Sequence, residues 1–402
     1  MSVMAILLFW AFLSSGFRTD GATDYLVYYE PVARNILNGL GFVRLDGAFA
    51  INNPPGYPIL LAGVFALARF LGLPENLVNL AFILLCMGLS SVFVFLLSEK
   101  IWGTRGGWFS ALFFMSYPFL LWLTKQPSSE VPFMAAFYAS LYLFWLGVKG
   151  QKNTWLLLLL AGMLAGVSML IRGIAIGIGF LLFGLFLVLR KDTSFKARLL
   201  LAIALLLGNF FVILPWQVWV YEQTGLVVSL GTNGVTSIKD GLTFAVESKN
   251  YRQKIAVPAD VADLQNELVS ENASMDSLGE ILRTVGKHFV KEPMPVMKLF
   301  MIKAGRSWYG TDSGSMEPAI LVIQLFYGVF SLLAILAIWR AHDVQTAGLL
   351  LFVSGFVLYF WLMTILVLSI LRYMVPTIGL FAFLIPQLAN SVSNRLSSRH
   401  SQ

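Results

Sequence analysis

The chain has 402 residues, of which 58% are hydrophobic and only 12% are charged. A soluble domain carries about 25% charged residues, and apolar runs near 20 residues recur here, so the sequence predicts an all-α polytopic membrane protein. The net charge of +7 comes mainly from bases in loops between the apolar runs, where they set the orientation in the membrane. The sequence has no basic stripe with interleaved aromatic residues, so nucleic acid is not expected as a partner. The single cysteine, Cys86, excludes an intrachain disulfide and a cysteine metal cluster.

The hydrophobic pattern predicts roughly ten membrane spans, beginning with a short apolar segment at 3–17. Lysine and arginine residues mark alternate loops and the C-terminal tail, which places both termini in the cytoplasm. Residues 55–72 are apolar too, but a crossing there would break this charge pattern, so we expect them to lie along the outer interface or to re-enter the membrane. The remaining spans are expected near 78–98, 107–124, 131–149, 154–171, 173–190, 198–220, 317–339, 345–370 and 373–391.

Three parts of the chain follow from this pattern. Residues 1–220 are expected to form an N-terminal transmembrane module with a first external loop at 18–77. Residues 221–316 have ordinary polarity and helix-like apolar spacing, and they are too long for a plain connector. We therefore expect a mostly helical external subdomain there, followed by C-terminal transmembrane helices and a cytoplasmic tail in 317–402.

The first external loop has acidic residues beside the bilayer. A charged side chain there is energetically costly, so each such residue is a candidate for a functional role. Glu30 and Arg34 are spaced as an i,i+4 pair, which an amphipathic interfacial helix with solvated charges explains well. That interpretation explains Asp24 less well, although Asp24 also stands where a helix-capping residue would. Asp20, four residues earlier, is the competing acid.

The stretch Asn52-Asn-Pro-Pro-Gly-Tyr-Pro58 predicts a rigid turn that leads into an apolar helix. A turn alone is one interpretation, and a shaped entrance for a substrate is the other. The entrance hypothesis involves Asn53, Pro55 and Tyr57 from this stretch, together with Tyr28 and Tyr373.

Glu130 begins a predicted span directly after Ser128 and Ser129. An acid in the first turn is favoured by the helix dipole, and either serine is a suitable cap, so a structural role and a functional one both fit. Lys125 is close enough in sequence for a simple ion pair with Glu130.

Four cations stand at the ends of apolar runs. Arg172 and Arg372 each lie between two such runs, and Lys303 and Arg306 lie where the external segment returns to the membrane. Each of them alone is explained as a snorkelling anchor. As a group they suggest a clamp for a phosphate, because arginine and lysine bind phosphate through charge-assisted hydrogen bonds.

Taken in order, these features resemble the GT-C glycosyltransferases, specifically the family 39-like group of protein O-mannosyltransferases and aminoarabinose-transferase-like enzymes. The ordered set comprises a short first span, an external acid and tyrosine before A-R-N-I-L, then P-P-G-Y-P, a serine–glutamate pair opening a span, a later arginine and a late R-Y-x-x-P. The resemblance covers roughly residues 1–240 and 300–391. It implies a GT-C-like helical bundle with interfacial helices in the first external loop.

The resemblance also implies an activity: inverting transfer of a sugar from a polyprenyl-phosphate carrier to a lipid, glycan or protein acceptor, outside a prokaryotic cytoplasmic membrane. By position, Asp24 resembles the catalytic base, Glu130 the second-loop acid, and the four cations the contacts of the donor phosphate. The family often has an Asp-Glu or Asp-Ala pair at the catalytic acid, whereas this chain has Asp20-Gly and Asp24-Tyr, so the choice between the two aspartates stays open. The sequence does not decide whether there is a cofactor, and a divalent metal, Mg²⁺ or Mn²⁺, held by Asp24 and Glu130 stays open as well.

A lipid or sugar transporter or flippase without transferase activity is the alternative. Transporters place ionisable residues and broken helices near the middle of the membrane. In this chain the acids stand at the ends of spans and in external loops, which favours chemistry at the membrane surface.

Overall fold

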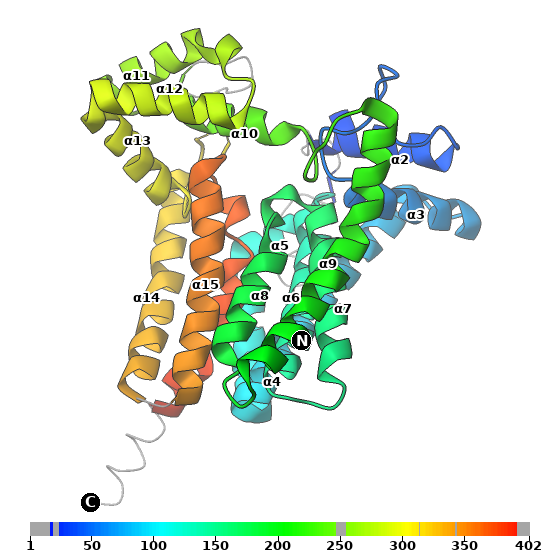
Figure 1. Cartoon of the computed structure of the whole chain (residues 1–402), viewed down its shortest axis with the longest axis vertical. Coiled ribbons are helices and arrows are strands. Elements are labelled where there is room, and N and C mark those ends of the chain that lie inside the picture. Colours follow the sequence, from blue (N-terminus) through cyan, green and yellow to red (C-terminus); the bar gives the residue numbers. More distant parts are fainter. Residues whose placement is uncertain (1–16, 19–23, 247–254, 313, 342–343, 392–402) are drawn as a thin grey trace, which may run out of the picture. The chain divides into compact units, whose positions relative to one another are not determined.

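A computed structural model describes residues 17–18, 24–246, 255–312, 314–341 and 344–391. Among them the chain is helical (Figure 1) and divides into two compact units. Unit 1 contains 1–231, 333–355 and 378–402, and unit 2 contains 232–332 and 356–377. The predicted all-α membrane fold is confirmed, while the domain boundaries expected from the sequence stay predictions.

The helices follow the chain from the first external loop to the C-terminal part. The elements up to residue 231 are η1 (Tyr25–Tyr29), α2 (Glu30–Leu37), α3 (Gly56–Leu71), α4 (Glu75–Met115), α5 (Pro118–Leu123), α6 (Glu130–Val148), α7 (Thr154–Ile171), η2 (Gly173–Ala175), α8 (Ile178–Leu189) and α9 (Phe195–Thr224). The later elements are α10 (Asn233–Leu242), α11 (Ala259–Ser270), η3 (Asn272–Ser274), α12 (Leu278–Lys291), α13 (Pro293–Arg306), α14 (Glu317–Ala341), α15 (Val344–Leu366), η4 (Leu371–Tyr373) and α16 (Thr377–Ala382).

Six helices in the described part of the chain are long and apolar enough to cross a membrane. They are Glu75–Met115, Glu130–Val148, Thr154–Ile171, Phe195–Thr224, Glu317–Arg340 and Thr346–Leu366. The predicted spans at 173–190 and 373–391 correspond to shorter apolar helices at Gly173–Leu189 and Thr377–Ser391. The predicted first span at 3–17 lies outside the described residues except for its last position, so the total of roughly ten spans stays a prediction.

The long helix α4 contains the boundary between two of the predicted spans. At Gly103 its backbone has a φ of 76° and a ψ of 178°, which is not helical. Glycine has no Cβ and adopts a positive φ without the steric cost that other residues have. The two halves fold back on each other at this break, because the hydroxyls of Ser98 and Ser110 lie 2.7 Å apart and the Ser91 hydroxyl lies 2.6 Å from the Met115 sulfur. The break expected between 98 and 107 therefore separates two helices that pack side by side.

Close backbone contact between α7 and α9 organises the core of unit 1 (Figure 1). A Cβ atom at Gly162 of α7 would collide with the carbonyl oxygen of Leu205, and one at Gly208 of α9 would collide with that of Leu159. Small residues at such crossings let transmembrane helices pack by direct backbone contact. These glycines therefore set how near α7 and α9 approach each other.

A buried asparagine adds polar contacts to the same core. The Asn209 side chain of α9 donates a hydrogen bond to the carbonyl oxygen of Gly162, at 3.4 Å. Its Oδ1 also lies 2.7 Å from where a Cβ of Gly179 in α8 would stand. Polar side chains inside a membrane bundle commonly bond across helices in this way, so Asn209 joins three helices.

The first external loop folds onto the start of α4. Arg34 of α2 pairs with Glu30 at 2.7 Å, which confirms the predicted i,i+4 pair, and with Glu75 at 2.9 Å. Its guanidinium also lies 4.9 Å from the centre of the Phe65 ring in α3. Arg34 thus ties α2 to both α3 and α4. In Figure 1, α3 runs crosswise to α7 and α9; whether it lies in the membrane interface stays a prediction.

Candidate active site

A buried ion pair joins the start of α6 to the end of α7. Nη1 of Arg172 lies 2.8 Å from Oε1 of Glu130, and the two side chains are 8% and 3% exposed. The same Nη1 donates a hydrogen bond of 2.9 Å to the Ser129 hydroxyl. Ser129 occupies the N-cap position of α6, but its side chain makes no capping bond. Glu130, Ser129 and Arg172 therefore form one polar cluster in unit 1.

The Asn52–Pro58 turn packs against the same end of α7. Gly56 lies so close to α7 that a Cβ there would stand 2.6 Å from the carbonyl carbon and oxygen of Leu170. A Cβ at Gly173 would lie 3.7 Å from the Pro54 ring. Because Arg172 stands between these two contact points, the turn and the buried ion pair belong to one site. Only glycine permits this approach at position 56.

The other end of the turn is fixed by Tyr28. Its hydroxyl donates a hydrogen bond of 2.8 Å to the carbonyl oxygen of Ala50 and accepts one of 3.2 Å from the backbone N–H of Asn53. Burial raises the pKa of Tyr28 to about 12, so at neutral pH this hydroxyl keeps its proton. Tyr28 therefore holds the turn in place.

The structure thus brings four of the five predicted entrance residues together. Pro55 is buried beside Gly56, and Tyr57 is fully buried with its ring 4.9 Å from that of Tyr29. Tyr373 belongs to η4, in unit 2. Whether these residues form a substrate entrance stays a prediction.

The structure describes only one of the two candidate aspartates. Asp24 precedes η1, is exposed, and makes no capping hydrogen bond with its side chain. Asp20 lies outside the described residues. Arg18 lies close to both aspartates in the sequence. Its backbone N–H donates a hydrogen bond of 2.8 Å to the carbonyl oxygen of Lys125. The start of the first external loop therefore contacts the loop that ends at Glu130.

Unit 2 contains the other three predicted cations, and Arg306 is paired there. Its guanidinium lies 2.8 Å from Glu317, and the two side chains are 5% and 13% exposed. Glu317 also accepts a hydrogen bond of 2.9 Å from the backbone N–H of Thr311. These bonds close the turn between α13 and α14, so much of the hydrogen-bonding capacity of Arg306 is already used.

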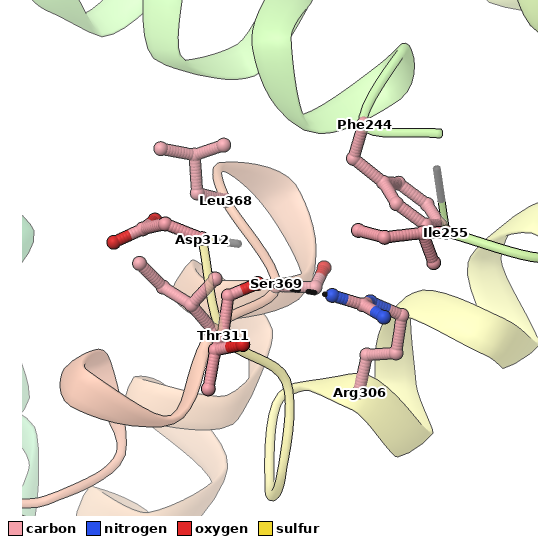
Figure 2. Close-up of a pocket in the computed structure, with 8 residues that line it drawn as sticks. Phe244, Ile255, Arg306, Thr311, Asp312, Leu368 and Ser369 are labelled. Carbon is pink, nitrogen blue, oxygen red and sulfur yellow. Dashed lines mark hydrogen bonds between the residues drawn. The ribbon is translucent and has the colours of Figure 1, made fainter. Parts of the chain in front are cut away.

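A small pocket of unit 2 lies beside Arg306. Figure 2 shows its guanidinium pointing at the Thr311 carbonyl oxygen, to which it donates a hydrogen bond of 3.3 Å. Asp312, on the rim, lies 3.8 Å from Arg372, whose side chain is 32% exposed. Arg372 is thus the most accessible of the four predicted cations. The pocket is lined by Phe244, Ile255, Arg306, Thr311, Asp312, Leu368, Ser369 and Ile370.

Lys303 is entirely buried in unit 2. Its Nζ donates hydrogen bonds to the carbonyl oxygens of Gly241, at 2.8 Å, and Val367, at 2.9 Å. Burial lowers the pKa of Lys303 to about 7, and a neutral amine has two N–H groups, which match these two carbonyls. Lys303 therefore connects α13 to α10 and to the end of α15. Its predicted contact with a donor phosphate stays a prediction.

The depressed pKa of Lys303 gives a testable dependence of stability on pH. Between pH 7 and the ordinary lysine value near 10.5, the unfolded chain binds more protons than the folded one, so the free energy of unfolding should rise with pH. Below pH 7 this group gives no slope. We expect the rise to disappear in Lys303→Met, measured by denaturant unfolding from pH 6 to 10. Equal slopes in both proteins would contradict a neutral Lys303, and Lys287→Met, on the exposed side of α12, is the control.

The predicted ligands of a divalent metal are Asp24 and Glu130. Among the described residues, no three His, Cys, Asp or Glu side chains form a cluster that would hold an ion. Glu130 already bonds to the guanidinium of Arg172, which neutralises its charge. The residues present do not fit a metal centre made by Asp24 and Glu130, and we derive no step through a metal.

One part of the chain matches a known family. Residues 52–219 match the family described as dolichyl-phosphate-mannose-protein mannosyltransferase. This region contains the Asn52–Pro58 turn, Glu130 and Arg172, which form the candidate site of unit 1. No curated protein matches the chain.

Solved structures match over the whole chain. The oligosaccharyltransferase of Archaeoglobus fulgidus in its apo form aligns with a TM-score of 0.57 and 14% identity, over 100% of this chain and 51% of that one. The same organism's AglB, in complex with an inhibitory peptide and a dolichol-phosphate, aligns with a TM-score of 0.55 and 12% identity over the same shares. The chain has the GT-C fold. The predicted GT-C-like helical bundle is thereby confirmed, and residues 52–219 carry the resemblance to the mannosyltransferase family.

A further structure shows a weaker likeness to this GT-C chain. ArnT from Cupriavidus metallidurans, bound to undecaprenyl phosphate, aligns with a TM-score of 0.46 and 14% identity, over 99% of this chain and 78% of that one. The GT-C chain spans about half the length of the oligosaccharyltransferase structures it matches. The fold and the membrane helices identify an integral membrane protein.

Sequence reasoning missed two features of this site. Ser129 had the appearance of a helix cap, but its hydroxyl accepts a hydrogen bond from Arg172 instead. Asn79 is a fully buried amide in the first part of α4. The available signal was a lone asparagine in the otherwise apolar run Leu77–Leu85, which is unusual inside a predicted span.

Proposed function

We propose that the chain is a membrane glycosyltransferase that takes a sugar from a polyprenyl-phosphate carrier. The observation that carries the proposal is the buried Glu130–Arg172 pair, packed against the Asn52–Pro58 turn in the region that matches the mannosyltransferase family. The GT-C fold and the dolichol-phosphate bound to AglB support a lipid-phosphate donor. The acceptor is a lipid, glycan or protein.

The proposed reaction inverts the anomeric carbon of the sugar. Asp24 accepts the proton of the acceptor's hydroxyl or amine, and the acceptor oxygen or nitrogen forms a bond to the anomeric carbon. The bond between that carbon and the phosphate oxygen breaks, and the phosphate leaves with the electron pair. The phosphate is already a good leaving group, so no strong general acid is needed.

Arg172 supports this chemistry in two ways. A guanidinium presents five N–H donors in one plane, an arrangement that suits the oxygens of a phosphate. A cation fixed by a buried carboxylate does not have to reorganise when negative charge develops on the leaving group. Arg372, Arg306 and Lys303 stay predicted donor contacts, and Arg372 is the most accessible of these three.

The proposed site faces outward from a prokaryotic cytoplasmic membrane. The support comes from the charge pattern, which places Lys100, Arg105, Lys149 and Lys152 in cytoplasmic loops. The loop that ends at Glu130 then lies on the opposite side, as does the first external loop. Cysteine labelling of residues 73–76 from outside the cell would support this, and labelling only from the cytoplasm would refute it.

Replacing Asp24 tests the proposed base directly. We expect Asp24→Asn to lower sugar transfer at least about a hundredfold, because the amide cannot accept the acceptor's proton. Transfer is measured with the full chain in nanodiscs and a panel of polyprenyl-phosphate sugars. Glu30→Gln is the matched control in the same loop, since Glu30 is accounted for by its ion pair with Arg34 and should have a mild effect.

Asp20→Asn, measured in parallel, decides between the two aspartates. If it abolishes transfer while Asp24→Asn does not, Asp20 is the base. If both variants transfer sugar as the wild type does, neither acid is catalytic and the proposed mechanism fails. A folded wild-type protein that turns over no donor but moves a lipid-linked sugar across a bilayer would favour the transporter alternative.

A further inference from the structure

An exposed ion pair on the rim of the unit 2 pocket joins the turn after α13 to η4. Oδ2 of Asp312 lies 3.8 Å from Nη1 of Arg372, and the two side chains are 57% and 32% exposed. Arg306, the other arginine at this pocket, pairs with Glu317 in a buried contact. In Figure 2 the Asp312 carboxylate points away from the Arg306 guanidinium. Each arginine therefore has a carboxylate partner, but only the pair of Arg372 is open to solvent.

Backbone contacts bring Asp312 and Arg372 together. The N–H of Leu371 donates a hydrogen bond of 2.8 Å to the carbonyl oxygen of Gly310. A Cβ at Gly310 would stand 2.6 Å from the carbonyl oxygen of Ser369, so glycine permits the two segments to approach this closely. Asp312 comes shortly after Gly310, and Arg372 directly follows Leu371. The register of this contact therefore sets the carboxylate beside the guanidinium.

The exposed pair can be exchanged for another anion, whereas the buried pair cannot. Separating Arg306 from Glu317 would leave two charges with little water around them. Separating Arg372 from Asp312 costs little, because water hydrates both charges once they part. A phosphate offers a guanidinium several charged oxygens at once, which makes it a strong competitor for the same donors.

We propose that Asp312 occupies the anion position at Arg372 when no donor is bound and gives way there to the phosphate of the lipid carrier. The carboxylate then competes with the phosphate, so it weakens the binding of the carrier. After transfer it takes the guanidinium back, which helps the sugar-free carrier to leave. Asp312 is a positioning residue, because it acts through Arg372. The inference rests on the proposed function, since it takes Arg372 as a contact of the donor phosphate.

The test measures how tightly sugar-free polyprenyl phosphate binds to the full chain in nanodiscs of neutral lipid. We expect Asp312→Asn to bind it about two- to fivefold more tightly, because the competing charge is removed. Damage to the structure would weaken binding, so it does not explain a gain. Asp276→Asn, at an exposed acid before α12, is the control variant and should leave the affinity unchanged. The uncharged polyprenol is the control ligand, and its binding should be the same in all variants.

A double-mutant cycle shows whether Asp312 acts through Arg372. In an Arg372→Gln background, Asp312→Asn should lose most of its effect on the affinity for polyprenyl phosphate. An undiminished gain in that background would mean that the carboxylate repels the ligand without Arg372, and it would overturn the proposal. Equal or weaker binding by Asp312→Asn in the wild-type background would overturn it as well. Asp312→Ala is the second variant and should give the same gain.

Sugar transfer distinguishes this inference from the proposed function. We expect added polyprenyl phosphate to inhibit transfer by Asp312→Asn at a lower concentration than it inhibits the wild type. If the wild type transfers sugar and neither binding nor inhibition changes in the variant, the role of Asp312 is refuted and the transferase stands. If the variant binds polyprenyl phosphate more tightly but the wild type transfers no sugar, the transferase is refuted and the exchange at Arg372 stands. No binding of polyprenyl phosphate by folded wild-type protein would overturn both.

Discussion

Replacing Arg172 with methionine should lower the free energy of unfolding by about 3–5 kcal/mol, because it removes the guanidinium that pairs with the buried Glu130 carboxylate. The guanidinium also serves Ser129, whose hydroxyl would lose its bond. Sugar transfer should fall on the order of a hundredfold or more, since the same cation is proposed to stabilise the leaving phosphate. Denaturant unfolding in detergent measures the first effect and the nanodisc transfer assay the second.

A double-mutant cycle shows whether the pair itself is responsible. Glu130→Gln alone should destabilise the protein less than Arg172→Met, and the double variant should recover part of the loss, because neither charge is then left buried alone. Asp46→Asn is the control, since its pair with Arg44 is largely exposed and should contribute less than about 1 kcal/mol. Strictly additive effects of the two buried substitutions would show that Arg172 and Glu130 do not interact in the folded protein.

Replacing Gly208 with valine should cost about 2 kcal/mol or more of stability and reduce the yield of folded protein. A Cβ at this position collides with the carbonyl oxygen of Leu159, which is backbone and cannot rotate away, so α7 and α9 must move apart. Gly162→Val should act in the same way from the α7 side. The measurement is the unfolding temperature of purified protein together with the fraction that elutes as a single species.

Gly88→Ala is the matched control for this prediction. Gly88 also lies in a membrane-spanning helix, α4, but a Cβ there meets no atom within 4 Å. Since alanine is the better helix former, the substitution should be neutral or stabilising by up to about 1 kcal/mol. If Gly208→Val and Gly88→Ala leave the unfolding temperature equally unchanged, close packing of α7 on α9 is not what holds unit 1 together.

The fold class could be predicted from the sequence because it depends on composition and period. A membrane-spanning helix must satisfy its own backbone hydrogen bonds inside lipid, so apolar runs of about 20 residues identify it without knowledge of its neighbours. The break near Gly103 and the Glu30–Arg34 pair are likewise local, since they involve one residue or one helical turn. The resemblance to GT-C enzymes also depended only on the order of short motifs along the chain.

The environment of each cation could not be predicted in this way. Arg172, Arg306 and Lys303 look alike in sequence, as bases at the ends of apolar runs. Arg172 has a carboxylate partner on another helix and Arg306 one across a turn, whereas Lys303 has no acid but two backbone carbonyls. Burial and partners decide what a charged group does, and both depend on tertiary contacts.

By itself, then, the sequence determined that this is a helical membrane protein with its acids near the ends of spans, because those properties follow from local hydropathy and spacing. Only the tertiary structure decided that Gly56 must be a glycine and that Ser129 bonds to Arg172 and not to its own helix. The physical reason is range. Ser129 and Arg172 are 43 positions apart, and a hydrogen bond or a steric limit between such distant segments exists only once packing has brought them within a few ångströms of each other.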